Sequence, residues 1–146
     1  MPALKPGEIG RLLARPDPAR RAILIYGPDS GLVSERADKL AASCGVDTAD
    51  PFATIRLDAD IAAADRNRLL DEAFTVGMFG GDRLIRVSGS TRRNLAEALK
   101  PVVDATLENA WVIVEAGDLK KGAGLRALFE RSKTAIAIPC YLDEGR

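Results

Sequence analysis

Short apolar runs alternate along this chain with stretches in which apolar residues recur at helical spacing. The runs that have the length and composition of strands are Ala22–Tyr26, Ala53–Leu57, Arg83–Val87, Trp111–Glu115 and Ala135–Pro139. Three of them, AILIY, WVIVE and AIAIP, are almost wholly apolar, which is typical of strands buried on both faces of a parallel sheet. The run RLIRV contains two arginines, so we expect it nearer an edge of the sheet.

The stretches between these runs predict helices, each with one apolar stripe. The stripes are Val33, Ala37, Leu40 and Ala41; Leu69, Leu70, Ala73 and Phe74; Leu95, Ala98, Leu99, Val102 and Val103; and Leu125, Leu128 and Phe129. A further helix is expected over Gly7–Ala14, with Pro6 near its first turn. We expect Pro101 to break or kink the helix in which it lies. This alternation of strands and helices predicts a three-layer α/β fold around a mostly parallel sheet of five strands.

Composition and charge narrow the class of protein. A chain of 146 residues suits one domain, and 47% hydrophobic with 29% charged residues is typical of a soluble globular protein rather than a disordered one. Lysine and arginine total 21, as do aspartate and glutamate, so no general attraction to nucleic acid or to a membrane is expected. The sequence contains neither an apolar run of roughly 20 residues, as a membrane span needs, nor a secretory signal at its start, MPALKPGEIG.

Histidine is absent, and the two cysteines are Cys44 and Cys140. The lack of histidine excludes Ser-His-Asp and Cys-His mechanisms and His-ligated zinc, and two cysteines cannot make a four-cysteine zinc site. Two thiols far apart in sequence suggest a reducing compartment, so we expect a cytoplasmic protein. We expect neither a metal site nor a cofactor.

The segment after the first strand stands where a phosphate-binding loop would lie, between a buried strand and a helix N-terminus. A working loop has the pattern GxxxxGK(S/T). Counting from Gly27, the second glycine position holds Leu32, the lysine position holds Val33, and only Ser34 matches. Valine cannot make the charge-assisted contact that lysine makes with the terminal phosphates.

Other residues of this loop also disfavour a nucleotide. Asp29 adds a negative charge, and Gly31 stands one position before the expected glycine. The alternative is a plain strand-to-helix turn in which Asp29 or Ser30 caps the helix. We therefore expect the loop from Gly27 to Ser34 not to bind nucleotide.

Acidic residues follow two of the predicted strands. Glu115 ends the fourth strand, where nucleotide hydrolases place acids that hold magnesium, but it stands alone there. The alternative is a strand-end carboxylate that accepts a hydrogen bond from a neighbouring loop. Asp58 and Asp60 follow the second strand and could bind a cation or belong to a solvated turn.

The segment Gly77-Met78-Phe79-Gly80-Gly81 joins a predicted helix to a predicted strand. The glycines allow a sharp turn, and two large apolar side chains on such a turn can be presented to a partner. The alternative is that Met78 and Phe79 close the core between helix and strand. Three pairs of basic residues lie at the boundaries of predicted elements, where we expect their side chains to be solvated. They are Arg20 and Arg21, Arg92 and Arg93, and Lys120 and Lys121.

Several motifs in order resemble the delta subunit of the bacterial DNA polymerase III clamp loader. They are YGPDSGLVSERADKLA after the first strand, FTVGMFGGDRLIRVSG in the middle, and WVIVEAGDLKKGAGLRALFE and AIAIPCY near the end. The resemblance covers nearly the whole chain. It implies that residues 1–146 are an amino-terminal AAA+-like domain that has lost nucleotide binding, with 141–146 leading as a linker toward lid and collar domains that this chain lacks.

The resemblance also implies a function. Met78 and Phe79, flanked by Gly77 and Gly80, match the element that enters a hydrophobic pocket of the sliding clamp, the beta subunit, with Met78 where leucine is common. The domain would bind the clamp and help open it for loading onto primed DNA during replication, without catalysis of its own. Its partners would be the clamp, other loader subunits and, through the complex, DNA, in a bacterial cytoplasm.

Two other functions stay open at the level of sequence. One is a divergent P-loop phosphotransferase that uses Ser34 and Glu115. The other is a receiver-like or other small α/β interaction domain, in which Asp58 and Asp60 would form an acidic cluster.

Overall fold

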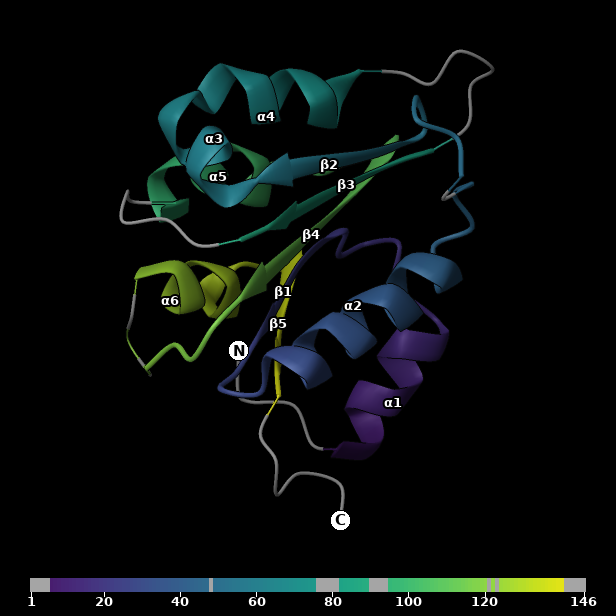
Figure 1. The fold of residues 1–146 in the computed structure, drawn as a ribbon, viewed down its shortest axis with the longest axis vertical. Helices are drawn as coiled ribbons and strands as arrows, with labels where there is room; N and C mark the ends of the chain where they lie inside the picture. The colour runs from purple at the N-terminus through teal and green to yellow at the C-terminus, as the bar shows by residue number, and fades with distance from the viewer. Residues whose placement is uncertain are drawn as a thin grey trace.

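A parallel sheet forms the middle layer of the protein (Figure 1). The structure, a computed structural model, describes residues 6–47, 49–75, 82–89, 95–120, 122 and 124–140. Within these ranges the sheet has five strands in the order β2-β3-β4-β1-β5. The strands are β1 (Ala22–Tyr26), β2 (Thr54–Asp58), β3 (Arg83–Ser88), β4 (Ala110–Ala116) and β5 (Ala135–Pro139). Every neighbouring pair is parallel, as the apolar runs predicted.

Helices cover both faces of this sheet (Figure 1). One face carries α1 (Pro6–Ala14) and α2 (Ser30–Ser43), and the other carries α3 (Ala59–Ala64), α4 (Arg66–Phe74), α5 (Leu95–Val103) and α6 (Gly124–Arg131). Each face has its own apolar core, in which alternate residues of β1 point to opposite sides: Ile23 and Ile25 pack toward α2, and Leu24 packs toward α6. The three-layer α/β fold expected from the sequence is confirmed.

The strand order places a topological switch at the centre of the sheet. β1 lies between β4 and β5, whereas β2, the next strand along the chain, is at the far edge. Ligands of open α/β sheets bind outside the carboxyl ends of the strands at such a switch. Receiver domains have the flavodoxin-like order, with the first strand between the second and the third, so the receiver-like interpretation is wrong for this topology.

β3 lies next to the edge strand β2, which agrees with its expected place nearer an edge of the sheet. The burial of its arginines was not predicted, since Arg83 and Arg86 are only 2% and 4% exposed. Both arginines can be buried because they have carboxylate partners inside the protein.

The apolar stripes of two helices match the structure residue by residue. Val33, Ala37, Leu40 and Ala41 are the buried residues of α2, and all five residues of the predicted stripe are buried in α5. α5 does not end at Pro101 but continues to Val103.

Two local features were not predicted. Phe74, assigned to the buried stripe of α4, is 51% exposed, although Leu69 and Ala73 of that stripe are buried. The short helix α3 begins directly after β2 because the Asp58 carboxylate accepts a hydrogen bond of 3.0 Å from the Asp60 amide at its start.

Burial changes the chemistry of Cys44, which follows the last turn of α2. Desolvation raises the pKa of the Cys44 thiol from 9.0 to about 12, while the charge of Arg21 lowers it and that of Asp82 raises it to smaller extents. The thiol is therefore neutral at physiological pH and is a poor nucleophile.

We expect Cys44 to make the folded state sensitive to alkaline pH. Between about pH 9 and about 12 the unfolded chain releases the thiol proton while the folded chain keeps it, so the free energy of unfolding falls by at most about 1.4 kcal/mol per pH unit. Urea unfolding at several pH values should show a smaller loss in this range for Cys44→Ala than for the unchanged protein. Equal losses would contradict the assignment.

Candidate functional site

The loop after β1 is packed tightly at the topological switch. The Gly27 amide donates a hydrogen bond of 3.1 Å to the Gly117 carbonyl after β4, and the Cys140 amide after β5 donates one of 2.7 Å to the Tyr26 carbonyl. A Cβ atom on Gly27 would lie 1.9 Å from the carbonyl oxygen of Cys140. Glycine is therefore required at position 27 by close packing of the backbone, a role that does not involve a ligand.

The N-terminus of α2 carries its own negative group. Asp29 is the N-cap residue, and its carboxylate accepts a hydrogen bond of 3.1 Å from the Leu32 amide. This is the end of the helix where a phosphate would bind, because unpaired amides and the helix dipole favour an anion there. The capping alternative with Asp29 is confirmed, and its charge would repel an incoming phosphate.

The residues that follow Asp29 either pack in the core or are exposed. Val33, at the lysine position, is 4% exposed and packs in the core of the α2 face. Leu32 packs against the same core, while Ser30, Gly31 and Ser34 are exposed. A lysine at position 33 would place its charge among apolar side chains rather than against a ligand.

Glu115, the acid at the end of β4, is held by an arginine that the sequence analysis did not single out. Arg86 of β3 donates to one carboxylate oxygen of Glu115 from Nη2 at 2.9 Å and from Nε at 3.3 Å. Its Nη1 donates to Asp38 of α2 at 2.9 Å. Burial lowers the pKa of Arg86, but hydrogen bonds and charges from Glu115 and Asp38 outweigh it and raise that pKa above its ordinary value.

This ion pair occupies the place that a metal ion would need. A magnesium ion uses a free carboxylate together with phosphate oxygens, and the carboxylate of Glu115 is already neutralised by a guanidinium group. Asp58 is engaged as the cap of α3. Across the described ranges, no group of three or more Cys, Asp or Glu residues is arranged to hold a metal ion.

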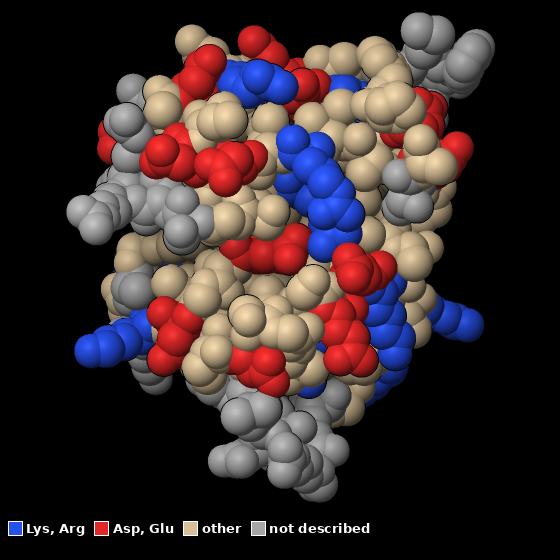
Figure 2. Space-filling view, in the orientation of Figure 1, with Lys and Arg blue, Asp and Glu red and all other residues tan. Residues whose placement is uncertain are grey.

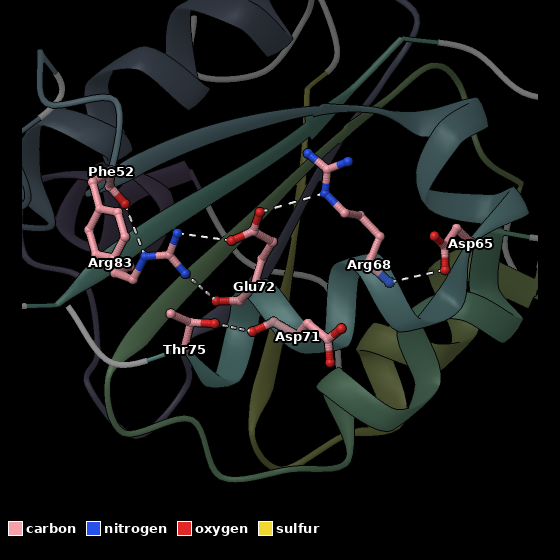
Figure 3. A network of polar contacts seen from close by, with 7 residues as sticks. All are labelled: Phe52, Asp65, Arg68, Asp71, Glu72, Thr75 and Arg83. Atoms are coloured by element: carbon pink, nitrogen blue, oxygen red, sulfur yellow. Dashed lines mark hydrogen bonds and ion pairs between the residues drawn. The ribbon is translucent and has the colours of Figure 1, made fainter. Parts of the chain in front are cut away.

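A second buried arginine lies at the opposite end of β3 (Figure 3). Arg83 donates from Nε to the Phe52 carbonyl at 3.0 Å and from Nη1 to the Glu72 carbonyl at 2.8 Å. Its Nη2 forms an ion pair of 2.9 Å with the Glu72 carboxylate. The sequence signal for both buried arginines was the run RLIRV. Its two arginines are three residues apart, and residues three apart in a strand point to opposite faces of the sheet.

The residues predicted to contact the clamp fall next to this network in the sequence. Gly77, Met78, Phe79 and Gly80 lie outside the described residues, between the end of α4 and the start of β3. The described start of β3 is at the amino edge of the parallel sheet, whereas the loop after β1 is at the carboxyl edge.

Charges of both signs are interspersed over the face seen in Figure 2. Of the predicted basic pairs, Arg21 forms an ion pair of 3.0 Å with Asp82 and lies over the Trp111 ring. Arg20 lies 4.0 Å from Asp17, and Lys120 is exposed, while 92, 93 and 121 are outside the described residues. No helix within the described part of the chain is long and apolar enough to cross a membrane.

Solved structures share this fold. A DNA polymerase III gamma subunit-related protein of Thermotoga maritima superimposes with a TM-score of 0.64 at 15% identity, over 95% of this chain and 46% of that one. The DNA clamp loader delta protein of Bacillus subtilis gives a TM-score of 0.67 at 16% identity, over 92% of this chain and 42% of that one. No family model and no curated protein sequence matches the chain.

These likenesses establish the fold and leave function to be argued. The chain shares its three-layer α/β fold with these two structures, as the alternation of strands and helices predicted. It spans less than half the length of each of these two structures. At this level of identity the fold is shared without the chemistry being fixed.

The Arg86 ion pair predicts unequal effects at its two carboxylates. Removing the Glu115 carboxylate, which is 13% exposed, leaves a buried guanidinium without its main partner, so Glu115→Ala should lower the free energy of unfolding by about 3 kcal/mol. Asp38 is 65% exposed, so Asp38→Ala should cost about 1 kcal/mol or less. Urea unfolding measures both variants, and equal losses would argue against a buried pair.

Proposed function

We propose that this chain is a clamp-loader domain that binds the sliding clamp and helps to open it for loading onto primed DNA, without turning over nucleotide itself. The observation that carries the proposal is a clamp-loader fold in which the phosphate site is filled by the protein's own groups. The fold supports the family, and the filled site supports a subunit of the non-catalytic kind.

The absence of catalysis follows from charge and space at the switch point. The Asp29 carboxylate stands where an anion would bind, Val33 stands in the core where a lysine would be needed, and Glu115 is paired with Arg86. A phosphotransferase using Ser34 and Glu115 would need a cation and a phosphate at this place, and both are disfavoured. ATP would be used by sister subunits of the loader.

Contact with the clamp is proposed for Met78 and Phe79. In the sequence they belong to the segment between α4 and β3. Burial of each apolar side chain in a partner's pocket would contribute roughly 1.5–3 kcal/mol. Two such side chains in one pocket form the kind of centre that dominates an interface.

Opening of the ring requires more than binding. A ligand shifts an equilibrium only by the difference in its affinity for the two states, so the domain must bind the open ring more tightly than the closed one.

The other loader subunits are proposed as neighbours, DNA as an indirect partner, and the cytoplasm as the location. Residues 1–146 would be the amino-terminal domain, and 141–146 a linker to lid and collar domains.

Substitution of Phe79 tests the contact. In a titration of the protein with purified sliding clamp, Phe79→Ala should weaken binding about 30-fold, because a central aromatic anchor is worth 2 kcal/mol or more. Ile61→Ala is the matched control, since Ile61 is 52% exposed on α3, which follows the carboxyl end of β2. Its affinity should equal that of the unchanged protein. Equal binding by both variants would remove Phe79 from the interface, and failure of the unchanged protein to bind would overturn the proposed function.

A clamp with a disrupted ring interface tests the opening step. The protein should bind this interface-deficient clamp at least about tenfold more tightly than the closed ring. Binding to this clamp does not require free energy to separate the ring interface. Titration calorimetry with both clamp forms provides the comparison. Identical affinities would leave a clamp-binding domain that does not open the ring.

A further inference from the structure

An open pocket lies between α1, the connection from α1 to β1, and β5, and we call it the α1–β5 pocket. It encloses about 350 Å³, at the lower end of the range for ligand sites. Among the described residues that line it, Ile136 alone comes from the sheet, near the amino end of β5. The pocket is therefore separate from the loop after β1, which lies at the carboxyl edge. Its other lining residues are Glu8, Arg11, Leu12, Arg15, Asp17 and Arg20.

One side of α1 forms the wall of this pocket. Glu8, Arg11, Leu12 and Arg15 recur at the i, i+3, i+4 and i+7 spacing that places residues on one side of a helix. The Arg15 amide donates to the Arg11 carbonyl at 2.8 Å, so the last helical turn extends to Arg15. Ile9, on the adjoining side, is buried in the core of the α2 face. That burial holds the wall in place.

Three guanidinium groups line the pocket together with two carboxylates, which gives it a net charge of +1. Arg20 lies 4.0 Å from Asp17 and is compensated by it. No described residue forms an ion pair or a hydrogen bond with the guanidinium group of Arg11 or Arg15. Both of these side chains are exposed. Guanidinium groups bind carboxylates and phosphates through paired hydrogen bonds, so the pocket favours an anionic ligand.

The pocket also offers apolar surface between these charges. Leu12 is half-buried and packs partly against the core of the α2 face, and Ile136 belongs to that core. β5 is the edge strand of the sheet, so no further described strand covers this side of the pocket. A ligand that fills the pocket therefore needs an apolar group as well as negative charge.

These features favour a peptide over a nucleic acid. A nucleic-acid strand carries a charge at every phosphate, binds through several cations and stacks its bases on aromatic side chains. The described lining of the pocket has an excess of one positive charge and contains no aromatic residue. A peptide can instead place carboxylates beside Arg11 and Arg15 and an apolar side chain between them.

We propose that the α1–β5 pocket binds an acidic segment of a partner protein in which carboxylate side chains flank an apolar one. The carboxylates pair with Arg11 and Arg15, and the apolar side chain packs on Leu12 and Ile136. Recognition of acidic motifs by clustered arginines works through the same contacts. The inference goes beyond the proposed function and is independent of it, because it uses no residue of the predicted clamp contact.

The test titrates a fluorescently labelled peptide, acetyl-Glu-Leu-Glu-Leu-Glu-amide, with the protein and follows fluorescence anisotropy. Arg11→Gln and Arg15→Gln should each weaken binding about threefold, and the double variant about tenfold, because each removes one exposed ion pair. Arg56→Gln is the matched control, since Arg56 is an exposed arginine on β2 at the opposite edge of the sheet. This variant should bind like the unchanged protein.

Removal of a negative charge from the pocket should have the opposite effect. Glu8→Gln raises the net charge of the lining from +1 to +2, so its affinity should rise about twofold. A change that only damaged α1 would not strengthen binding. Higher salt should weaken binding to the unchanged protein more than binding to the double variant, because fewer charges are screened in the variant.

Two further peptides separate the charged from the apolar contribution. Versions with glutamine in place of each glutamate, or with serine in place of each leucine, should bind about tenfold more weakly or worse. Equal binding by either one overturns the proposal.

The remaining outcomes also decide the question. The proposal is overturned by an equal loss in Arg56→Gln, by a thymidine oligonucleotide that binds more tightly than the acidic peptide, or by an absence of saturation below about 1 mM peptide. Self-association of the protein that is lost in the Arg11→Gln, Arg15→Gln double variant would make a second copy the occupant, and overturns it as well. The sliding clamp is absent from this assay, so each of these results leaves the proposed function as it stands.

Discussion

Two arginines buried on opposite faces of β3 each require a carboxylate, and this requirement ties the sheet to both helical layers. Arg83 takes Glu72 from α4, while Arg86 takes Glu115 from the neighbouring strand and Asp38 from α2. A buried guanidinium without such partners would be strongly destabilising. The register of β3 and the positions of the two helices are therefore coupled through five side-chain charges in addition to apolar packing.

The same pairs make the two ends of the sheet different in character. At the carboxyl edge, the Asp29 carboxylate caps α2, and the Glu115 carboxylate is paired with Arg86. At the amino edge, Arg83 joins the start of β3 to the last turn of α4 through the carbonyl and the carboxylate of Glu72.

Most of the fold could be predicted because the apolar pattern carries it. The bounds of β1 and β5 follow from continuous apolar runs, and the buried faces of α2 and α5 follow from period-3.6 repeats that no tertiary contact overrides. The burial of Arg83 and Arg86 in β3 could not be predicted in this way, because it depends on where Glu72 and Glu115 lie in space. Phe74 was wrongly predicted to be buried for a related reason. The apolar stripe of α4 does not show where the packing of this helix against its neighbours ends.

The residues that disfavour nucleotide binding at the candidate site could be predicted from the sequence. The spacing predicted valine at the lysine position and a helix cap at Asp29 or Ser30, and the structure shows that Asp29 is the cap. The pairing of Glu115 was not visible, because its partner is 29 residues earlier in the chain and on another strand. The contact residues Met78 and Phe79 stay a prediction from sequence.

The carboxylate at the start of α2 has a consequence for behaviour in the cell. In a nucleotide-dependent domain, the anion that stabilises this helix end comes and goes with the cofactor, and the stability of the fold changes with its concentration. Here the anion is covalently part of the chain, at residue 29. The stabilisation that Asp29 gives to this helix end is therefore independent of the concentration of any ligand.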